Sequence, residues 1–350
     1  MCGIFGCVLL SGDAAPIIRE GLKRLEYRGY DSAGLATIHG GSIHVKKGRG
    51  RIDELHEALN FNDLPGCVGI GHTRWATHGA PSTVNAHPHI DCHGLVAVVH
   101  NGVLENFQSL REELEARGHL FRSKTDTEVL SHLIEEGLEQ GLPLKEAVRR
   151  ALLRVEGSFA VAAMSPKEPD KVVVARRESP LVIGVGPQGV FFSSDLPALL
   201  WLTRRASFLG DYDLAVITSK GFQVEDLRTS LAVERPIEEV SWSAEQAEKG
   251  GFPHFMLKEI HEQPQAVRNT LRTPRAYLEK ACSLLDASSK VFMVACGTSY
   301  HACVAGSYMF SQLAKLDARP VIASEFKEAC GPLIDSSPAI LALSQSGETA

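Results

Sequence analysis

The chain has 350 residues, of which 44% are hydrophobic and 22% are charged, and its formal net charge is −6. This is an ordinary globular composition, and the length exceeds what a single core usually holds, so we expect two domains. The negative charge balance gives no reason to expect nucleic acid or an anionic membrane as a partner.

No run of residues approaches the roughly 20 apolar positions that a helix needs to span a bilayer. The opening run IFGCVLL follows no basic segment and is too short for a secretion signal, so it predicts a buried strand. The 8 cysteines are scattered without paired CxxC spacing, which is typical of reduced thiols. We therefore expect a cytoplasmic protein.

The first half of the chain alternates between predicted strands and predicted helices. After the opening strand, apolar side chains at residues 15–27 have helical spacing, and residues 28–39 return to a strand. Buried strands at 66–74 and 94–101 are followed by helices at 107–118 and 125–138. Thr125 or Asp126 is the expected N-cap of the last helix.

The pattern from Ser158 to Val224 indicates short strands separated by turns. The whole alternation predicts one α+β domain from residue 2 to about residue 226. Residues 227–253 lose periodicity and are the expected linker.

The rest of the chain, residues 254–350, has a different pattern. A helical stretch at 256–271 leads to VFMVACGTSYHACVAGSYMF, which is a hydrophobic strand, a tight glycine turn and a helix. The pattern recurs in AILALSQSGETA at the end of the chain. This order predicts a parallel sheet of the doubly wound α/β type.

The run GVGPQG at residues 184–189 has the letters of a dinucleotide-binding loop. Apolar strands lie on both sides of it, no helix follows, and Pro187 suits a turn. We therefore expect a β-hairpin here.

A group of histidines could suggest zinc, with an aspartate and a cysteine beside them. The group comprises His72, His78, His87, His89, His93 and His100, together with Asp91 and Cys92. The segment NAHPHIDCHG contains a proline and lacks the i, i+4 spacing of a zinc-binding helix. We expect these histidines to serve structure or substrate, and we assign no metal; a metal-dependent hydrolase is the disfavoured alternative.

Cys2 stands directly after the initiator methionine. Removal of Met1 would leave a thiol and a free α-amine on one residue, and an amine with a pKa of about 7.7–8.0 can accept the thiol proton near neutral pH. N-terminal nucleophiles use their own amine in this way. The alternative is that Cys2 is one more core cysteine, although a chain terminus is not naturally a core position.

Other residues could complete such a site. Thiol attack on an amide needs donors aimed at the developing oxyanion, and Asn101 and Gly102 close a predicted buried strand. Arg74 could hold a substrate carboxylate with two hydrogen bonds. Asp126 could hold an amino group, and helix capping is its structural alternative.

Several motifs occur together in this order: MCGIFG, RLEYRGYDSAGLA, HTRWATHG, NAHPH, HNGVLEN and TDTEV. Together they resemble the type-2 glutamine amidotransferase domain. With CGTSYHA and SQSGETA, they resemble the N-terminal portion of the glucosamine-6-phosphate synthase family, also called glutamine–fructose-6-phosphate aminotransferases. The resemblance covers essentially the whole chain.

The resemblance implies an αββα sandwich of the N-terminal-nucleophile type and a role for each matching residue. Cys2 is the implied nucleophile that forms a γ-glutamyl thioester and releases ammonia, and Asn101 and Gly102 form the implied oxyanion hole. Glutamine would be bound by Arg74, Thr77, His78, His87 and Asp126. Trp75 would gate the passage of ammonia.

The second half resembles the start of a sugar-isomerase (SIS) domain, truncated at Ala350. Hydroxyls and backbone N–H groups at helix N-termini can hold phosphate without net positive charge. The residues implied for the phosphate of fructose 6-phosphate are Thr298, Ser299, Ser344, Gln345, Ser346 and Thr349. Simple helix capping by Ser and Thr is the alternative.

The resemblance implies the synthesis of glucosamine 6-phosphate, for hexosamine biosynthesis, without cofactor or metal. The family's isomerase base and Schiff-base lysine have no counterpart in these residues, so we expect glutaminase activity alone, with weak or absent binding of fructose 6-phosphate. The family further implies a homodimer formed through SIS domains. The alternative is a stand-alone glutaminase or a regulatory sugar-phosphate-binding protein.

Overall fold

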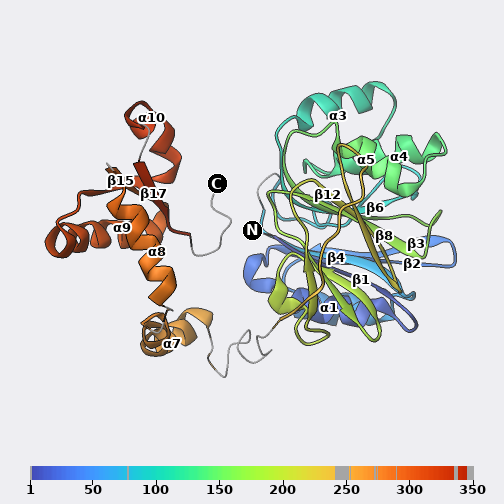
Figure 1. Ribbon diagram of the computed structural model, residues 1–350. Coiled ribbons are helices and arrows are strands. Elements are labelled where there is room, and N and C mark those ends of the chain that lie inside the picture. Colours follow the sequence, from blue (N-terminus) through green and yellow to red (C-terminus); the bar gives the residue numbers. More distant parts are fainter. Residues whose placement is uncertain are drawn as a thin grey trace. The chain divides into compact units, whose positions relative to one another are not determined.

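The structure is a computed structural model that describes residues 2–76, 79–240, 252, 254–271, 273, 275–288, 290–334 and 338–344. The chain divides into two compact units, Met1–Glu248 and Lys249–Ala350 (Figure 1). Each unit has its own core. None of the helices in the described ranges is long and apolar enough to cross a membrane.

Two antiparallel sheets form the centre of the first unit. Within the described residues, the first sheet has eight strands in the order β14-β11-β9-β10-β1-β4-β2-β3. These strands are β1 (Gly3–Leu9), β2 (Ser32–His39), β3 (Ser42–Arg49), β4 (Val68–Arg74), β9 (Val182–Gly186), β10 (Gly189–Ser193), β11 (Arg205–Phe208) and β14 (Glu238–Glu239).

The second sheet has six strands among the described residues, in the order β13-β12-β8-β7-β6-β5. They are β5 (His89–Ile90), β6 (Ala97–Leu104), β7 (Gly157–Met164), β8 (Lys171–Arg177), β12 (Asp213–Thr218) and β13 (Gly221–Asp226). The two sheets face each other across an apolar layer to which β1 contributes Ile4 and Val8 and β6 contributes Ala97 and Val99.

Helices cover the outer face of each sheet (Figure 1). The helices α1 (Ala14–Arg24) and α2 (Ile52–Leu59) pack on the first sheet, where the alternate residues Phe5 and Cys7 of β1 point toward them. The helices α3 (Phe107–Ala116), α4 (Glu128–Glu139) and α5 (Leu144–Leu152) pack on the second sheet. The αββα sandwich is therefore confirmed.

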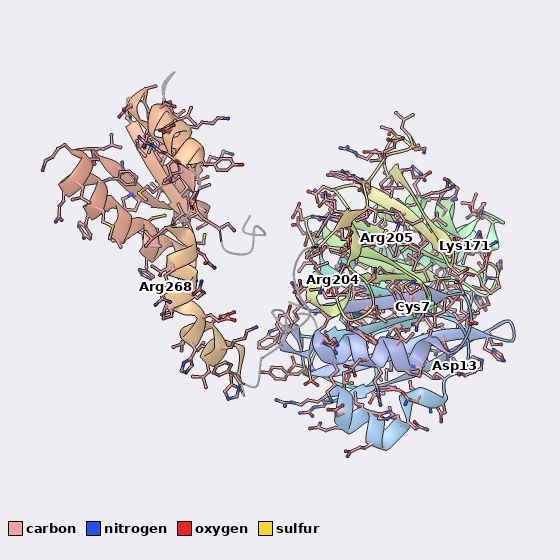
Figure 2. All side chains as sticks on the ribbon, turned by 60° about the horizontal axis from the view of Figure 1, so that its bottom comes forward. Cys7, Asp13, Lys171, Arg204, Arg205 and Arg268 are labelled. Carbon is pink, nitrogen blue, oxygen red and sulfur yellow. The ribbon has the colours of Figure 1, made fainter. Side chains whose placement is uncertain are left out.

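The alternation of side chains along the strands produces these layers, because successive residues of a strand point to opposite faces. Cys7 lies inside the first unit, whereas the side chains of Arg204 and Arg205 lie at its surface (Figure 2). The hairpin expected at residues 184–189 is also confirmed, because β9 pairs with β10 in antiparallel register, Gly186 opposite Gly189.

Residues 227–240, expected to begin the linker, pack on the first unit instead. Leu227 is buried in the core beneath α5, and Arg235 donates hydrogen bonds to both carboxylate oxygens of Asp213, at 2.6 and 2.9 Å. Strand β14 then pairs with β11 at the edge of the sheet. The expected boundary near residue 226 was too early because this segment is held by polar contacts and strand pairing, which apolar periodicity does not reveal.

The second unit is a parallel α/β arrangement, as expected. Its described strands form a sheet in the order β16-β15-β17, in which β15 is parallel to both neighbours. Its elements are α7 (Phe255–Thr270), α8 (Arg275–Asp286), β15 (Lys290–Ala295), α9 (Gly297–Met309), β16 (Ala318–Ile322), α10 (Phe326–Cys330) and β17 (Pro338–Ala342). Arg268 lies on α7 (Figure 2).

Candidate active site

Cys2 lies at the end of a fully paired central strand. It directly precedes β1, which pairs with β4 so that Gly3 faces Thr73, and this register places Cys2 beside the end of β4 at Arg74. The Trp75 N–H donates to Cys2 Sγ at 3.2 Å, and Cys2 Sγ lies 3.4 Å from the Trp75 carbonyl oxygen. The terminal residue is thus held by its neighbours, which removes the fraying expected of a chain end.

Strand β6 of the other sheet brings an amide to this position. Asn101 Nδ2 donates to the Cys2 carbonyl oxygen at 3.0 Å. On the other side of the same amide, Asn101 Oδ1 accepts from His72 Nε2 at 3.0 Å, and the His100 carbonyl oxygen lies 3.0 Å from the same nitrogen. Because both neighbours of His72 Nε2 are acceptors, the proton is assigned to this nitrogen.

His72 therefore fixes which end of the Asn101 amide faces Cys2. Burial lowers the pKa of His72 to about 3, an effect that outweighs its hydrogen bonds to Asn101 and His100, so the ring is neutral at ordinary pH. His72 stands in the motif HTRWATHG, but the motif did not indicate this positioning role, because the residue acts through a contact between two strands of different sheets.

Gly102 follows Asn101 in a backbone conformation that requires glycine. Its φ is +129°, and a Cβ at this position would lie 2.1 Å from the Ser158 carbonyl oxygen. No other residue fits here without moving β7.

Arg74 and Asp126 are both buried charged residues near Cys2. Burial lowers the pKa of Arg74, while Cys2 and Asp126 act on it electrostatically in the opposite direction. Arg74 Nη2 donates to the Gly79 carbonyl oxygen at 3.1 Å. The thiol, the guanidinium and the carboxylate are therefore close enough to act on one another electrostatically.

The expected N-cap of α4 was wrong. The helix begins at Glu128 with Thr127 at its N-cap, and the Thr127 side chain makes no capping hydrogen bond. Asp126 Oδ2 instead accepts from the Leu104 N–H at 3.0 Å, so this carboxylate is tied to the end of β6. Thr127 Oγ1 lies 2.9 Å from His100 Nδ1.

The thiol of Cys2 is not a ready nucleophile by itself. Burial raises its pKa, and the Trp75 N–H and the Arg74 charge only partly offset this effect. A nearby base is therefore needed near neutral pH. The α-amine of Cys2, once Met1 is removed, is positioned on the same residue to serve as that base.

The described start of one expected substrate loop, Trp75 and Ala76, lies directly after β4. The loop after β4 is held by Asp31, whose Oδ2 accepts from the Ala76 N–H at 2.9 Å. Trp75 in this loop is 45% exposed and makes an edge-on contact with the Tyr30 ring, 5.5 Å between centroids. Thr77 and His78 lie outside the described residues.

Most members of the histidine group suggested by the sequence are buried in contact with one another. The ring centroids of His72 and His87 are 4.1 Å apart, and those of His87 and His89 are 4.7 Å apart. Burial lowers the pKa of His87 and His89 well below the ordinary value, and it lowers that of His100. These neutral rings fill the space behind the Cys2 site, whereas the side chain of His93 is 64% exposed.

A surface hollow of about 430 Å³ is lined in part by Ser42, Ile43, Ile90, His93 and Lys167. None of the residues placed around Cys2 lines it.

The second unit brings part of the expected phosphate site together. Thr298 and Ser299 lie in the first turn of α9, directly after β15, and Ser344 follows the parallel strand β17. The Leu343 N–H donates to the Val294 carbonyl oxygen at 3.0 Å, so the carboxyl ends of the two strands lie side by side. Gln345, Ser346 and Thr349 lie outside the described residues.

Comparisons with known proteins agree with this arrangement. A model of the glutamine amidotransferase domain matches residues 72–201, and a model of the SIS domain matches residues 283–350. The chain is 49% identical to the glutamine–fructose-6-phosphate aminotransferase (isomerizing) of Thermococcus kodakarensis, over 100% of this chain and 58% of the relative. The enzyme of the same name from Thermus thermophilus is 47% identical, with the same coverage of 100% and 58%.

Two solved structures share the fold. A glutamine phosphoribosylpyrophosphate amidotransferase from B. subtilis, complexed with ADP and GMP, has a TM-score of 0.58 and 22% identity, covering 91% of this chain and 65% of that chain. The allosteric regulatory enzyme of purine biosynthesis has a TM-score of 0.56 and 28% identity, covering 66% and 50%.

The first unit is thus a glutamine amidotransferase domain with the N-terminal-nucleophile fold, and a SIS domain begins in the second unit. Along its whole length the chain is homologous to the glutamine–fructose-6-phosphate aminotransferases, and it spans 58% of the length of these relatives.

Proposed function

We propose that this chain hydrolyses glutamine to glutamate and ammonia, with Cys2 as the nucleophile. The observation that carries the proposal is the contact of Asn101 Nδ2 with the Cys2 backbone, 3.0 Å from its carbonyl oxygen, beside Gly102, whose backbone conformation with φ +129° requires glycine. This pair supplies hydrogen-bond donors next to the thiol, where the oxyanion of an attacked amide would develop.

The reaction begins when the α-amine of Cys2 accepts the thiol proton. Sγ then attacks the side-chain carbonyl carbon of glutamine, and Asn101 Nδ2 and the Gly102 N–H stabilise the oxyanion. The C–N bond breaks as the amine returns the proton to the leaving nitrogen, which gives ammonia and a γ-glutamyl thioester. Water then attacks the thioester, giving glutamate and the free thiol.

Arg74 and Asp126 would bind the charged ends of glutamine. The Arg74 guanidinium suits the α-carboxylate, with Thr77 beside it, and the Asp126 carboxylate suits the α-amine. His78 and His87 belong to the adjoining loops, and Trp75 would gate the passage of ammonia. Both charges are buried, so each interaction with substrate would be strong.

The test compares glutamate release from glutamine by the parent chain, Cys2→Ala and a control, Cys282→Ala, whose thiol is exposed on α8. We expect no glutamate from Cys2→Ala and the parent rate from Cys282→Ala. Retention of Met1 should also suppress the reaction, because it occupies the amine. Glutamate release by Cys2→Ala at the parent rate would contradict the proposal.

In a longer protein, the ammonia would aminate fructose 6-phosphate to give glucosamine 6-phosphate, as in hexosamine biosynthesis, without cofactor. The names of the relatives support this reaction, and the polar ends of β15 and β17 support a phosphate site at Thr298, Ser299 and Ser344, continued by Gln345, Ser346 and Thr349. Assembly as a homodimer through SIS domains belongs to the same proposal.

A cytoplasmic location is supported by the cysteines, all of which are free thiols.

A further inference from the structure

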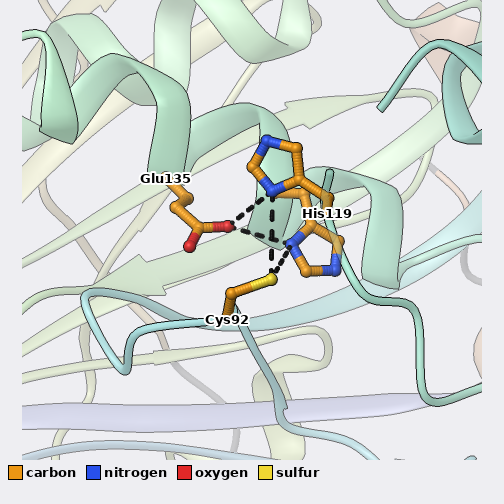
Figure 3. Close-up of side chains that lie close together, drawn as sticks. Cys92, His119 and Glu135 are labelled. Atoms are coloured by element: carbon orange, nitrogen blue, oxygen red, sulfur yellow. Dashed lines mark hydrogen bonds and ion pairs between the residues drawn. The ribbon is translucent and has the colours of Figure 1, made fainter. Parts of the chain in front are cut away.

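Four side chains that are far apart in the sequence meet between α4 and the segment that leads into β6. Cys92 follows β5, His119 follows α3, and His132 and Glu135 lie three residues apart on α4. Figure 3 shows the side chains of Cys92, His119 and Glu135 pointing toward one another. One ligand atom from each of the four lies within 4.8 Å of all the others.

The distances between these atoms lie on either side of the spacing expected around a small tetrahedral ion. Cys92 Sγ lies 3.7 Å from His132 Nδ1 and 4.0 Å from His119 Nδ1. Glu135 Oε2 lies 2.9 Å from His119 Nδ1 and 3.0 Å from His132 Nδ1. Zinc bonds of about 2.3 Å to sulfur and about 2.0–2.1 Å to nitrogen or oxygen would place such atoms roughly 3.3–3.6 Å apart at tetrahedral angles.

We propose that Cys92, His119, His132 and Glu135 form a structural zinc site. Thiolate, imidazole and carboxylate are the ligands that zinc takes in proteins, and four of them fill a tetrahedral shell. Such a closed site leaves no position for a reactive water, so its role is structural rather than hydrolytic.

Both imidazoles have a carboxylate on the side away from the cluster, although neither carboxylate is within hydrogen-bond distance. On each ring the nitrogen that does not face the cluster lies near a carboxylate: His119 Nε2 is 3.6 Å from Glu136, and His132 Nε2 is 3.9 Å from Glu128. Metal-binding histidines usually present their second nitrogen to a carboxylate, which fixes the ring and the tautomer.

The loop that carries Cys92 is held in shape by its own backbone contacts. Cys92 Sγ accepts from the Leu120 N–H at 3.3 Å. Asp91 accepts from the N–H groups of His93 and Val96, at 2.8 and 2.7 Å, which closes the turn around Cys92. The thiol is therefore directed toward the cluster before any ion binds.

The site would join two of the segments that carry residues of the proposed glutaminase site. Cys92 lies upstream of Asn101 and Gly102 on β6, and His119 lies upstream of Asp126 at the start of α4. A metal bond between these segments would hold the donors of β6 and the carboxylate of Asp126 at a fixed separation. This inference concerns stability and positioning, and it stands whether or not the glutaminase proposal holds.

The experiment measures zinc in the full 350-residue chain, purified without a polyhistidine tag and without chelator, and then titrates the metal-free protein with Co²⁺. We expect roughly one zinc per chain, and a thiolate-to-cobalt absorption band with the visible bands of a tetrahedral ion. Cys92→Ser and His132→Gln should each lose both signals. The control His93→Gln removes a neighbour of Glu135 that is not a ligand, and it should keep them.

A direct readout on the parent chain covers the case in which a ligand variant fails to fold. Zinc should protect Cys92 from alkylation, measured by peptide mass spectrometry, while the exposed Cys282 reacts equally with and without zinc. Three results would each overturn the proposal: metal-free parent protein that gives no thiolate–cobalt band, equal alkylation of Cys92 with and without zinc, or loss of zinc in His93→Gln.

Discussion

At the scale of single residues, Cys2 depends on groups from several other parts of the chain. Trp75 contacts its sulfur, Asn101 contacts its backbone, and Arg74 and Asp126 act on it electrostatically. These residues could be predicted because each stands in a motif. His72 also stands in a motif, but its role could not be predicted, because that role consists of one hydrogen bond to Asn101 that depends on how the two sheets are stacked.

Substitution of Arg74 or Asp126 should weaken the binding of glutamine more than it slows the chemical step. Arg74→Lys keeps the charge but loses the two-pronged geometry, so kcat/KM for glutamine should fall roughly tenfold or more, mainly through KM. Asp126→Asn retains an oxygen that can accept from the Leu104 N–H, and it should raise KM without loss of fold. Steady-state kinetics give the result, with the exposed Arg49→Lys as control. Parent-like kinetics in both site variants would refute their assignment.

At the scale of elements, the strongly periodic strands and helices of both units were predictable, and the weakly apolar ones were not. Strand β3 is a largely polar strand at the sheet edge, and β14 consists of two exposed glutamates. Their positions follow from strand pairing rather than from burial, so the sequence pattern gives no signal. The cluster at Cys92 was missed for a related reason, because Glu135 is 43 residues away and reaches Cys92 only when α4 packs on β6.

Strand β6 should not tolerate a side chain at Gly102. Gly102→Ala would combine a left-handed backbone, which costs about 1–3 kcal/mol, with a clash against β7. Gly141→Ala is the matched control, because Gly141 also has a positive φ, +82°, but open space around its Cβ position. Urea unfolding should therefore show a larger loss of stability for Gly102→Ala. Equal losses would mean that the close approach to Ser158 does not matter.

The buried histidine layer should make the first unit sensitive to acid. Unfolded His72 binds a proton near its ordinary pKa of 6.5, whereas the folded residue does so only at about 3, so stability is lost as the pH falls through this window. At pH 5 the loss from His72 alone should be about 2 kcal/mol. His72→Gln should lose less stability than the parent between pH 7 and pH 5 in urea unfolding. An identical pH dependence in the two proteins would contradict this explanation.

At the scale of the whole molecule, the residues of the two proposed sites lie in different units. All described residues placed around Cys2 lie in the first unit, and Thr298, Ser299 and Ser344 lie in the second. The motifs predicted this division, although the segment before residue 241 belongs with the first unit. The homology spans 58% of the relatives, so sugar amination remains a proposal for a longer protein.

The 350-residue chain, supplied with glutamine and fructose 6-phosphate, should release glutamate and form no glucosamine 6-phosphate. No residue in it is assigned as an isomerase base or a Schiff-base lysine, and the sugar phosphate should bind weakly at most. The two products are measured separately, by coupled assay for glutamate and by chromatography for the amino sugar. Amino sugar formed at a rate comparable to that of glutamate would show that the chain holds the complete machinery.

The central claim is that Cys2, with its free amine, attacks the side-chain carbonyl of glutamine. The most direct measurement treats the protein with a glutamine analogue that carries an electrophilic carbon at that position, and then maps the adduct by peptide mass spectrometry. We expect a single adduct on Cys2, formed in the chain that lacks Met1, suppressed by excess glutamine and far slower when Met1 is retained. An adduct on another residue, or equal labelling with and without Met1, would contradict it.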